Sequence, residues 1–270
     1  MHPFASNTTS NGGPDYNPDL MPLIDIISEA FEIPQLIKTR RITALLPHDY
    51  HETDRRYPVL YLQDGQNLFD DYAPFGSWEL RRQLARLKDK GLGDVIVVAI
   101  DHAEDERIAE FTPSQKTKLG VGDGKKYARF LAETLKPWVD LKYRTLPGVE
   151  HTGIGGSSMG GLISIYAVTQ HPELYSRLMI FSPSLWVSPS LAELFNRETS
   201  TFSGKIYLYG GRREGSELIT LLNSFKNSLA LNPNRDAIEV ELNISEYGEH
   251  NEKAWGEEFP RALKWLFFTK

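Results

Sequence analysis

Compact apolar runs alternate with amphipathic stretches along most of this chain. The runs at 58–62 and 95–100 are apolar throughout and are followed by polar residues. Strands that are apolar on both faces are typical of a buried parallel sheet. Further strand-like runs occupy 37–46, 178–181, 206–209 and 238–244. The last of these alternates apolar with polar residues, which predicts a strand at the edge of the sheet.

Helical spacing falls between these runs. The segment 78–90 places three leucines on one side, and Gly91 is expected to end the helix. The segment 127–140 repeats the apolar spacing, with Pro137 expected to distort its last turn. An amphipathic helix over 254–268 closes the chain. This order predicts a three-layer α/β fold, in which a mostly parallel central sheet carries helices on both faces.

The chain divides into a short lead-in and one domain. Its first 20 residues are polar and rich in glycine and proline, so we expect a flexible lead-in over 1–20. No repeat or linker interrupts the chain from 21 to 270, which predicts a single α/β domain. A chain of 270 residues is long enough to give such a domain a sizeable core.

Composition and charge narrow the class of protein. The net charge of −6 argues against a nucleic-acid partner or an anionic membrane surface. The absence of cysteine excludes disulfides, thiolate metal sites and cysteine nucleophiles. The N-terminal stretch lacks the apolar centre of a signal peptide, and no run is long enough to span a membrane. We therefore expect a cytoplasmic protein, while the sequence leaves any homo-oligomer undecided.

The segment 151–161 contains the motif Gly156-x-Ser158-x-Gly160 between a short apolar segment and an apolar helix. In a strand–turn–helix elbow the serine occupies a strained turn, so the positions two residues to either side must be minimal. The helix that follows directs its first amides toward the group that the serine attacks. Ser157 is the rival nucleophile, but Met159 occupies the place of its second glycine. The pattern therefore predicts a serine hydrolase with Ser158 as nucleophile.

A serine nucleophile needs a histidine base, and in α/β-hydrolase order that histidine follows the serine. Only His171 and His250 follow Ser158. His171 stands at the end of the elbow helix, where a histidine suits the helix dipole. His250 lies between the predicted edge strand and the closing helix, at the carboxyl end of the sheet. We expect His250 to be the base, although an exposed loop histidine is a common structural feature.

The acid that orients this histidine is expected after the penultimate strand. Glu214 follows that strand within a glycine-flanked turn and is the preferred candidate. Glu217 is the alternative, although a carboxylate there also suits the start of a helix. The oxyanion that forms during acyl transfer needs two backbone donors, and one is expected from the amide of Met159. The second is expected from Gln66 in the loop after 58–62, unless Asp64-Gly65 forms only an ordinary turn.

Several spaced segments together resemble a known family. They are the segments 57–69, 155–161 and 211–214, the sequence Arg107-x-x-Glu110-x-Thr112-Pro113, and His250 ahead of a tryptophan-bearing closing helix. Over 35–270 the chain resembles the putative-esterase branch of the α/β-hydrolase superfamily, which groups with esterase D-like, feruloyl and siderophore esterases. The resemblance implies a serine carboxylesterase with the α/β-hydrolase fold, an acyl-enzyme on Ser158 and water attack assisted by His250. It also implies no metal and no organic cofactor.

The substrate is expected to be a small-molecule carboxylic ester. Phe69, Trp78, Arg107 and Trp186 are candidate substrate-binding residues, together with Tyr72 and Phe75, because they surround the expected site. Aromatic residues of this kind also commonly pack beneath loops. The alternatives are a specialised feruloyl, acetyl-sugar or siderophore esterase, an acyltransferase at the same site, or a catalytically inactive binding protein of the same fold.

Overall fold

The central element of the structure is one sheet of eight strands in the order β1-β2-β4-β3-β5-β6-β7-β8. The structure is a computed structural model that describes residues 16–69, 73 and 76–269. Strands β1 and β2 are antiparallel to each other, β2 is antiparallel to β4, and the remaining neighbours are parallel. The strands are β1 (Leu23–Ile33), β2 (Lys38–Leu46), β3 (Val59–Gln63), β4 (Ile96–Ile100), β5 (Thr152–Ser157), β6 (Arg177–Phe181), β7 (Gly204–Gly211) and β8 (Ile238–Ser245).

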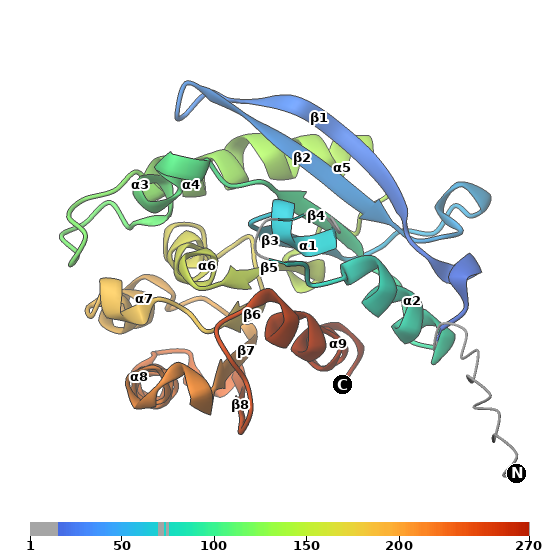
Figure 1. Ribbon diagram of the computed structural model, residues 1–270. Helices are drawn as coiled ribbons and strands as arrows, with labels where there is room; N and C mark the ends of the chain where they lie inside the picture. The colour runs from blue at the N-terminus through green and yellow to red at the C-terminus, as the bar shows by residue number, and fades with distance from the viewer. Residues whose placement is uncertain (1–15, 70–72, 74–75, 270) are drawn as a thin grey trace, which may run out of the picture.

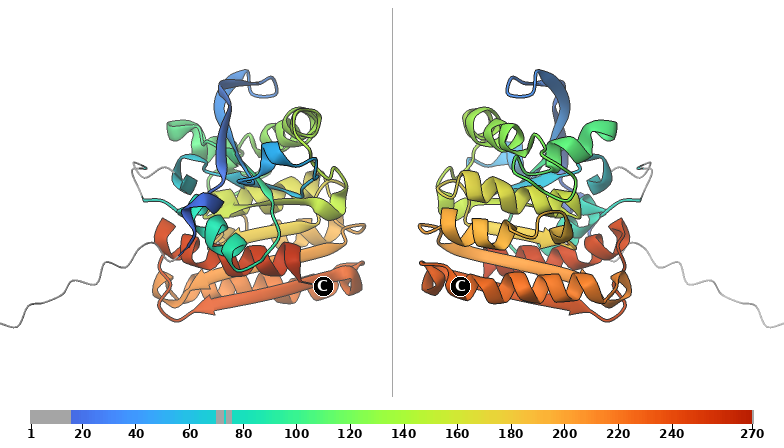
Figure 2. Two further views of the ribbon diagram at one scale, coloured as in Figure 1. Left: turned by 90° about the vertical axis from the view of Figure 1, so that its right-hand side faces the viewer. Right: turned by 90° about the vertical axis from the view of Figure 1, so that its left-hand side faces the viewer.

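Helices cover both faces of this sheet (Figures 1 and 2). Helices α2 (Leu80–Asp89) and α9 (Glu252–Phe268) pack together on one face, beside α1 (Gln66–Phe69). The other face carries most of the remaining helices. They are α4 (Gly124–Phe130), which continues through a π-helical turn (Leu131–Leu135) into α5 (Lys136–Lys142), then α6 (Met159–Gln170), α7 (Leu191–Glu198) and α8 (Ser216–Ser228). The short helix α3 (Arg107–Phe111) packs against α4 and α6. The predicted three-layer α/β fold is confirmed.

Strand β4 is apolar throughout and β3 is apolar from Val59 to Leu62, because each face of these two strands meets a different helical layer. In β3, Tyr61 belongs to the core beneath α4 and α6, whereas Leu60 and Leu62 belong to the core beneath α2 and α9. Successive side chains of a strand point to opposite faces, so a strand buried on both sides cannot carry a polar face. Strand β8 forms an edge of the sheet and keeps an alternating pattern, as predicted.

Two local predictions differ from the structure, and one strand was not predicted. The lead-in was expected to reach residue 20, but Pro18–Leu20 form a 3₁₀ turn and β1 begins at Leu23; residues 1–15 lie outside the described residues. The edge strand β1 has exposed and half-buried positions, so its sequence lacks the continuous apolar run that identified the inner strands. Near Pro137 the helix widens into the π-helical turn before the proline, because a proline cannot donate to the preceding turn.

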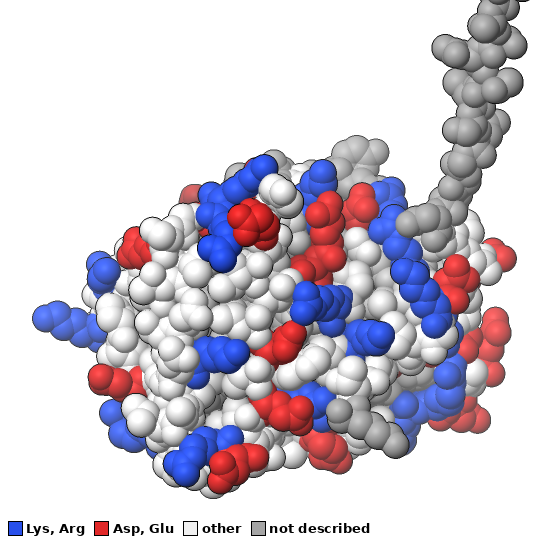
Figure 3. All heavy atoms as spheres, turned by 90° about the horizontal axis from the view of Figure 1, so that it is seen from below, with Lys and Arg blue, Asp and Glu red and all other residues white. Residues whose placement is uncertain are grey.

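The surface seen from below shows lysine and arginine side chains interspersed with aspartate and glutamate side chains (Figure 3). Charged side chains of the described residues form ion pairs, such as Arg261 with Glu241 at 3.0 Å. Among the described residues, no helix combines the length and the apolar character that a membrane crossing requires.

Candidate active site

Ser158 occupies the sharp turn between β5 and α6. Its backbone has φ 56° and ψ −122°, which is the left-handed side of the map that a non-glycine residue rarely adopts. A Cβ atom on Gly160 would lie 2.8 Å from Asp64 Oδ2, and one on Gly156 would lie 3.1 Å from Gln63 Cβ. A larger residue would clash at Gly160 and be crowded at Gly156, which agrees with the sequence motif, and the turn presents the serine hydroxyl at the carboxyl edge of the sheet.

A hydrogen-bonded row of three side chains connects Ser158 to a buried acid. Ser158 Oγ lies 3.1 Å from His250 Nε2, and His250 Nδ1 lies 2.6 Å from Glu214 Oε2. The serine comes from the β5–α6 turn, the glutamate from the turn after β7, and the histidine from the loop between β8 and α9. These three residues are 92 positions apart along the chain from first to last, and the parallel sheet brings them to one edge.

Glu214 is held in place by a second set of hydrogen bonds. Its side chain is only 2% exposed, and Oε1 accepts from the Gly211 amide at 2.7 Å and from the Ser182 hydroxyl at 2.8 Å. Ser182 Oγ in turn accepts from the Trp255 indole at 2.9 Å. The Trp255 ring also packs edge-on against the His250 ring. One carboxylate oxygen therefore anchors the turn, which leaves the other to orient the imidazole.

Close backbone contact joins the turn that carries the acid to the loop that carries the histidine. A Cβ atom on Gly211 would stand 2.0 Å from the Gly248 carbonyl oxygen, so only glycine fits there. The Arg213 amide donates to the same carbonyl at 3.2 Å. This contact, together with the pairing of Gly211 with Ser245 at the end of β7 and β8, holds the two loops beside each other.

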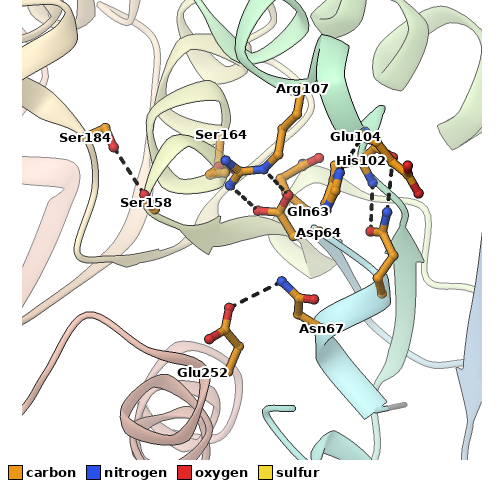
Figure 4. Close-up of polar contacts among 12 residues, drawn as sticks. Gln63, Asp64, Asn67, His102, Glu104, Arg107, Ser158, Ser164, Ser184 and Glu252 are labelled. Carbon is orange, nitrogen blue, oxygen red and sulfur yellow. Dashed lines mark hydrogen bonds and ion pairs between the residues drawn. The ribbon is translucent and has the colours of Figure 1, made fainter. Parts of the chain in front are cut away.

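The loop after β3 is fastened to the end of β4 and to α3. Both polar atoms of the Gln66 side chain bond to the His102 backbone, at 3.1 Å and 2.9 Å. Arg107 donates two hydrogen bonds to the Asp64 carboxylate, at 2.6 Å and 2.8 Å (Figure 4). Gln66 and Met159 are the first residues of α1 and α6, and the first amides of a helix have no acceptor within it.

A cavity of about 710 Å³ lies beside Ser158 and His250. Its lining combines polar and charged side chains with a few apolar ones. The lining residues are Asp64, Gln66, Asn67, His102, Glu104, Asp105, Arg107, Ile108, Ser157, Ser158, His250, Glu252 and Trp255. A smaller pocket of about 200 Å³ lies on the other side of His250 and includes Pro183, Trp186, Leu218 and Leu221. The row of three side chains therefore has space on both sides.

The structure shows which of the candidate substrate-binding residues line a pocket and which are packed in the core. Trp78 is 2% exposed and stacks on Phe181 in the core beneath α9, so its assignment to substrate binding is wrong. Phe69 packs half-buried against the same core and is absent from the cavity lining, so that assignment is also corrected. Both were chosen for position in sequence, which does not reveal the direction of a side chain. Arg107 lines the larger cavity and Trp186 the smaller pocket.

The two further aromatic candidates, Tyr72 and Phe75, lie outside the described residues.

The alternative candidates for the nucleophile, the base and the acid do not take part in the row of three side chains. Ser157 is the last residue of β5 and is buried. His171 lies at the end of α6, 3.4 Å from Glu173. Glu217 stands in the first turn of α8 and lines the smaller pocket, and of these two described acids it is Glu214 that bonds to His250.

Three residues of the site were not found from the sequence. Ser182 and Ser184 follow β6, and Ser184 Oγ lies 3.3 Å from Ser158 Oγ. Asp64 was noted only as part of a turn, but it holds Arg107 through two bonds. Residues that directly follow a parallel strand collect at the carboxyl edge of the sheet. The position of Ser182 and Ser184 directly after β6 could therefore have predicted from the sequence that both lie near the site.

Asp101 is a partly buried acid beneath the loop after β3. Its Oδ1 would stand 2.5 Å from a Cβ atom on Gly65. Burial raises the pKa of Asp101 to about 6, with the charges of Glu29 and Asp64 acting in the same direction and those of Arg41 and Arg40 opposing. The folded state therefore holds this proton more tightly than the unfolded state does.

Asp101→Asn is expected to change how stability depends on pH. Because the folded-state pKa is raised, the favourable contribution of Asp101 is fully present below about pH 4 and is lost as pH rises through about 6. The variant cannot lose this contribution. The free energy of unfolding of the variant minus that of the wild type should therefore be larger at pH 7 than at pH 4, by on the order of 2 kcal/mol. Urea unfolding across this range measures the difference. Asp236→Asn, at an exposed site, is the control; identical pH slopes for Asp101→Asn and wild type would contradict the prediction.

Comparison with known proteins agrees with the fold and with the resemblance seen in the sequence. Residues 34–266 match the protein family described as "Putative esterase", and the chain therefore belongs to that family. The protein YbbA of Bacillus subtilis (strain 168) is 21% identical over 248 residues, which cover 84% of this chain and 92% of YbbA. Membership places this protein among the carboxylic ester hydrolases.

Solved structures share the architecture at low sequence identity. The enterobactin esterase FES from Shigella flexneri, in the presence of enterobactin, matches with a TM-score of 0.69 at 18% identity, covering 93% of this chain and 60% of that chain. The ferulic acid esterase AmCE1/Fae1A from Anaeromyces mucronatus matches with a TM-score of 0.66 at 20% identity, covering 98% of each. The predicted α/β-hydrolase fold of the esterase branch is confirmed.

Proposed function

We propose that this protein hydrolyses small carboxylic esters through an acyl-enzyme on Ser158. The observation that carries the proposal is the row from Ser158 Oγ through His250 to Glu214, with separations of 3.1 Å and 2.6 Å. A serine hydroxyl becomes a strong nucleophile when a base takes its proton, and an orienting carboxylate keeps that base in the correct tautomer. We assign these roles to Ser158, His250 and Glu214.

The reaction runs in two halves. Ser158 Oγ bonds to the ester carbonyl carbon while His250 Nε2 takes the hydroxyl proton. The tetrahedral intermediate then collapses, the alkoxide leaves with the proton from His250, and the acyl group stays on Ser158. Water attacks this acyl group and gives a proton to His250, which returns it to Ser158 as the carboxylic acid departs. The amides of Met159 and Gln66 are the proposed donors to the oxyanion in both halves.

The side chain of His250 is 48% exposed, which favours hydrolysis over transfer to an alcohol. Water can reach the base directly, whereas a transferase must keep water away from its acyl-enzyme. The three-residue row also disfavours a binding protein that has lost its chemistry. The named neighbours act on or are crystallised with feruloyl and enterobactin compounds. Feruloyl, siderophore and acetyl-sugar esters are accordingly the alternative, more specialised substrates. The values of kcat/KM for a panel of such esters should rank them.

Covalent labelling tests the proposed nucleophile. A fluorophosphonate probe should label the wild-type protein, and peptide mass spectrometry should place the adduct on Ser158 rather than on Ser157 or Ser184. The same protein should release nitrophenol from p-nitrophenyl acetate and butyrate. Absence of labelling together with absence of turnover for every ester would overturn the proposal in favour of a binding protein. Product release only when an acceptor alcohol is added would favour a transferase.

A further inference from the structure

The larger cavity carries an excess of negative charge. Four carboxylates line it, from Asp64, Glu104, Asp105 and Glu252, against one guanidinium, that of Arg107. Arg107 donates two short hydrogen bonds to Asp64, so the positive charge of Arg107 is balanced by the negative charge of Asp64. The other three carboxylates come from different parts of the chain. Glu104 and Asp105 belong to the 3₁₀ turn after β4, and Glu252 is the first residue of α9.

No ion pair neutralises these three carboxylates among the residues that the structure describes. Glu106, the third acid in the same turn, behaves differently because it reaches Lys38 at 2.5 Å. Glu252 instead faces Asn67, whose Nδ2 donates to it at 3.3 Å (Figure 4). Burial raises the pKa of Glu252, and the charge of Asp64 acts in the same direction. A backbone hydrogen bond and the charges of His250 and Arg107 act in the opposite direction.

The histidine on this side of the cavity does not supply a balancing charge. His102 Nδ1 accepts a hydrogen bond from the Glu104 amide at 2.9 Å, which requires that nitrogen to be unprotonated. Burial lowers the pKa of His102, in agreement with this contact. On the face that Figure 3 shows, by contrast, acidic and basic side chains are interspersed.

We propose that the preferred substrate is an ester whose part lying in the larger cavity carries an organic ammonium group. This inference rests on the proposed function, because it names the substrate class of the same site. An ammonium group beside Glu104, Asp105 and Glu252 gains Coulomb attraction, and a carboxylate or phosphate there is repelled. Among the described residues, no three side chains of metal-binding type are grouped closely enough to hold a metal ion, so an organic cation fits the lining better.

Matched pairs of esters that differ only in charge test this inference. For a cation on the alcohol side, acetylcholine is compared with 3,3-dimethylbutyl acetate, which replaces the trimethylammonium group by a tert-butyl group. For a cation on the acyl side, the ethyl ester of trimethylglycine is compared with ethyl 3,3-dimethylbutanoate. The measured quantity is the ratio of kcat/KM for the charged ester to that for the neutral ester, at low ionic strength.

The double variant Glu104→Gln/Asp105→Asn is expected to lower this ratio for at least one pair by about tenfold, since each carboxylate contributes about threefold across several ångströms of water. The wild-type ratio for that pair should also fall as salt is added. The ratio cancels any general damage to catalysis, because both esters meet the same enzyme. Glu193→Gln/Glu198→Gln on α7 removes the same charge at exposed positions outside the cavity and should leave the ratio unchanged.

The possible failures are distinguishable. If p-nitrophenyl acetate is hydrolysed but the Glu104→Gln/Asp105→Asn variant leaves both ratios as in wild type, the ammonium inference is overturned and the proposed function stands. An equal fall in the α7 control would overturn it in the same way, because the effect would then come from net charge. If no ester of any kind is hydrolysed, the proposed function itself is overturned and the inference with it.

Discussion

Ser158→Ala is expected to lower kcat/KM for p-nitrophenyl acetate at least about a thousandfold, because it removes the atom that we propose as the nucleophile. The residual rate would come from the oxyanion donors and from substrate binding alone. The measurement is initial-rate kinetics on purified protein, together with the loss of fluorophosphonate labelling. Thermal unfolding of the variant shows whether the fold is kept, since alanine must adopt the same left-handed backbone as Ser158.

Ser157→Ala is the matched control because it removes a hydroxyl from the adjacent position. Ser157 is buried at the end of β5 and, among the described residues, has no hydrogen bond to a histidine. Its activity should stay within about fivefold of wild type, which is a typical scale for a change outside the reacting groups. If Ser158→Ala keeps a tenth or more of the wild-type activity, Ser158 is not the nucleophile.

Glu214→Gln is expected to lower kcat/KM by about 10²- to 10⁴-fold. Glu214 Oε1 accepts from Gly211 and Ser182, and a glutamine carbonyl can keep both of these bonds. The amide nitrogen then replaces Oε2 beside His250 Nδ1 and can only donate, so the imidazole is forced into the wrong tautomer. The variant therefore separates the catalytic contact from the structural contacts, and steady-state kinetics with a thermal unfolding curve measures both.

Glu217→Gln is the companion variant that decides between the two candidate acids. Glu217 lies three residues further on, lines the smaller pocket and stands in the first turn of α8. Because its side chain is exposed and no described contact links it to His250, its kcat/KM should stay within about fivefold of wild type. Equal losses in the two variants, or a larger loss for Glu217→Gln, would remove Glu214 from the proposed mechanism.

The pattern of apolar and polar residues within a segment predicted the structure correctly where that pattern depends only on how the segment itself is buried. Strands β3 and β4 were predicted from their continuous apolar runs, since both of their faces are buried. The elbow was predictable because its glycine, serine and glycine positions lie within five residues, from Gly156 to Gly160, although the side chains that crowd them include Gln63 and Asp64. Strand β1 was missed because its half-exposed positions carry polar residues and leave no continuous apolar run.

Long-range packing decided what the pattern could not. Trp78 and Trp186 are both aromatic residues near the site in sequence, yet one stacks in the core and the other lines a pocket. The bonds from Glu214 to Ser182, and from Ser182 to Trp255, join three loops or helices that are distant along the chain. No periodicity encodes such contacts, because they depend on how separate elements meet.

The sequence alone predicted the fold class, the serine in its elbow, and a histidine and two candidate acids after it, because each of these depends on spacing along one chain. The tertiary structure alone decided the geometry of the row, the anchoring of Glu214 and the three carboxylates that face the cavity. The physical reason is that hydrogen bonds and cavity charge act over a few ångströms between residues that lie far apart in sequence.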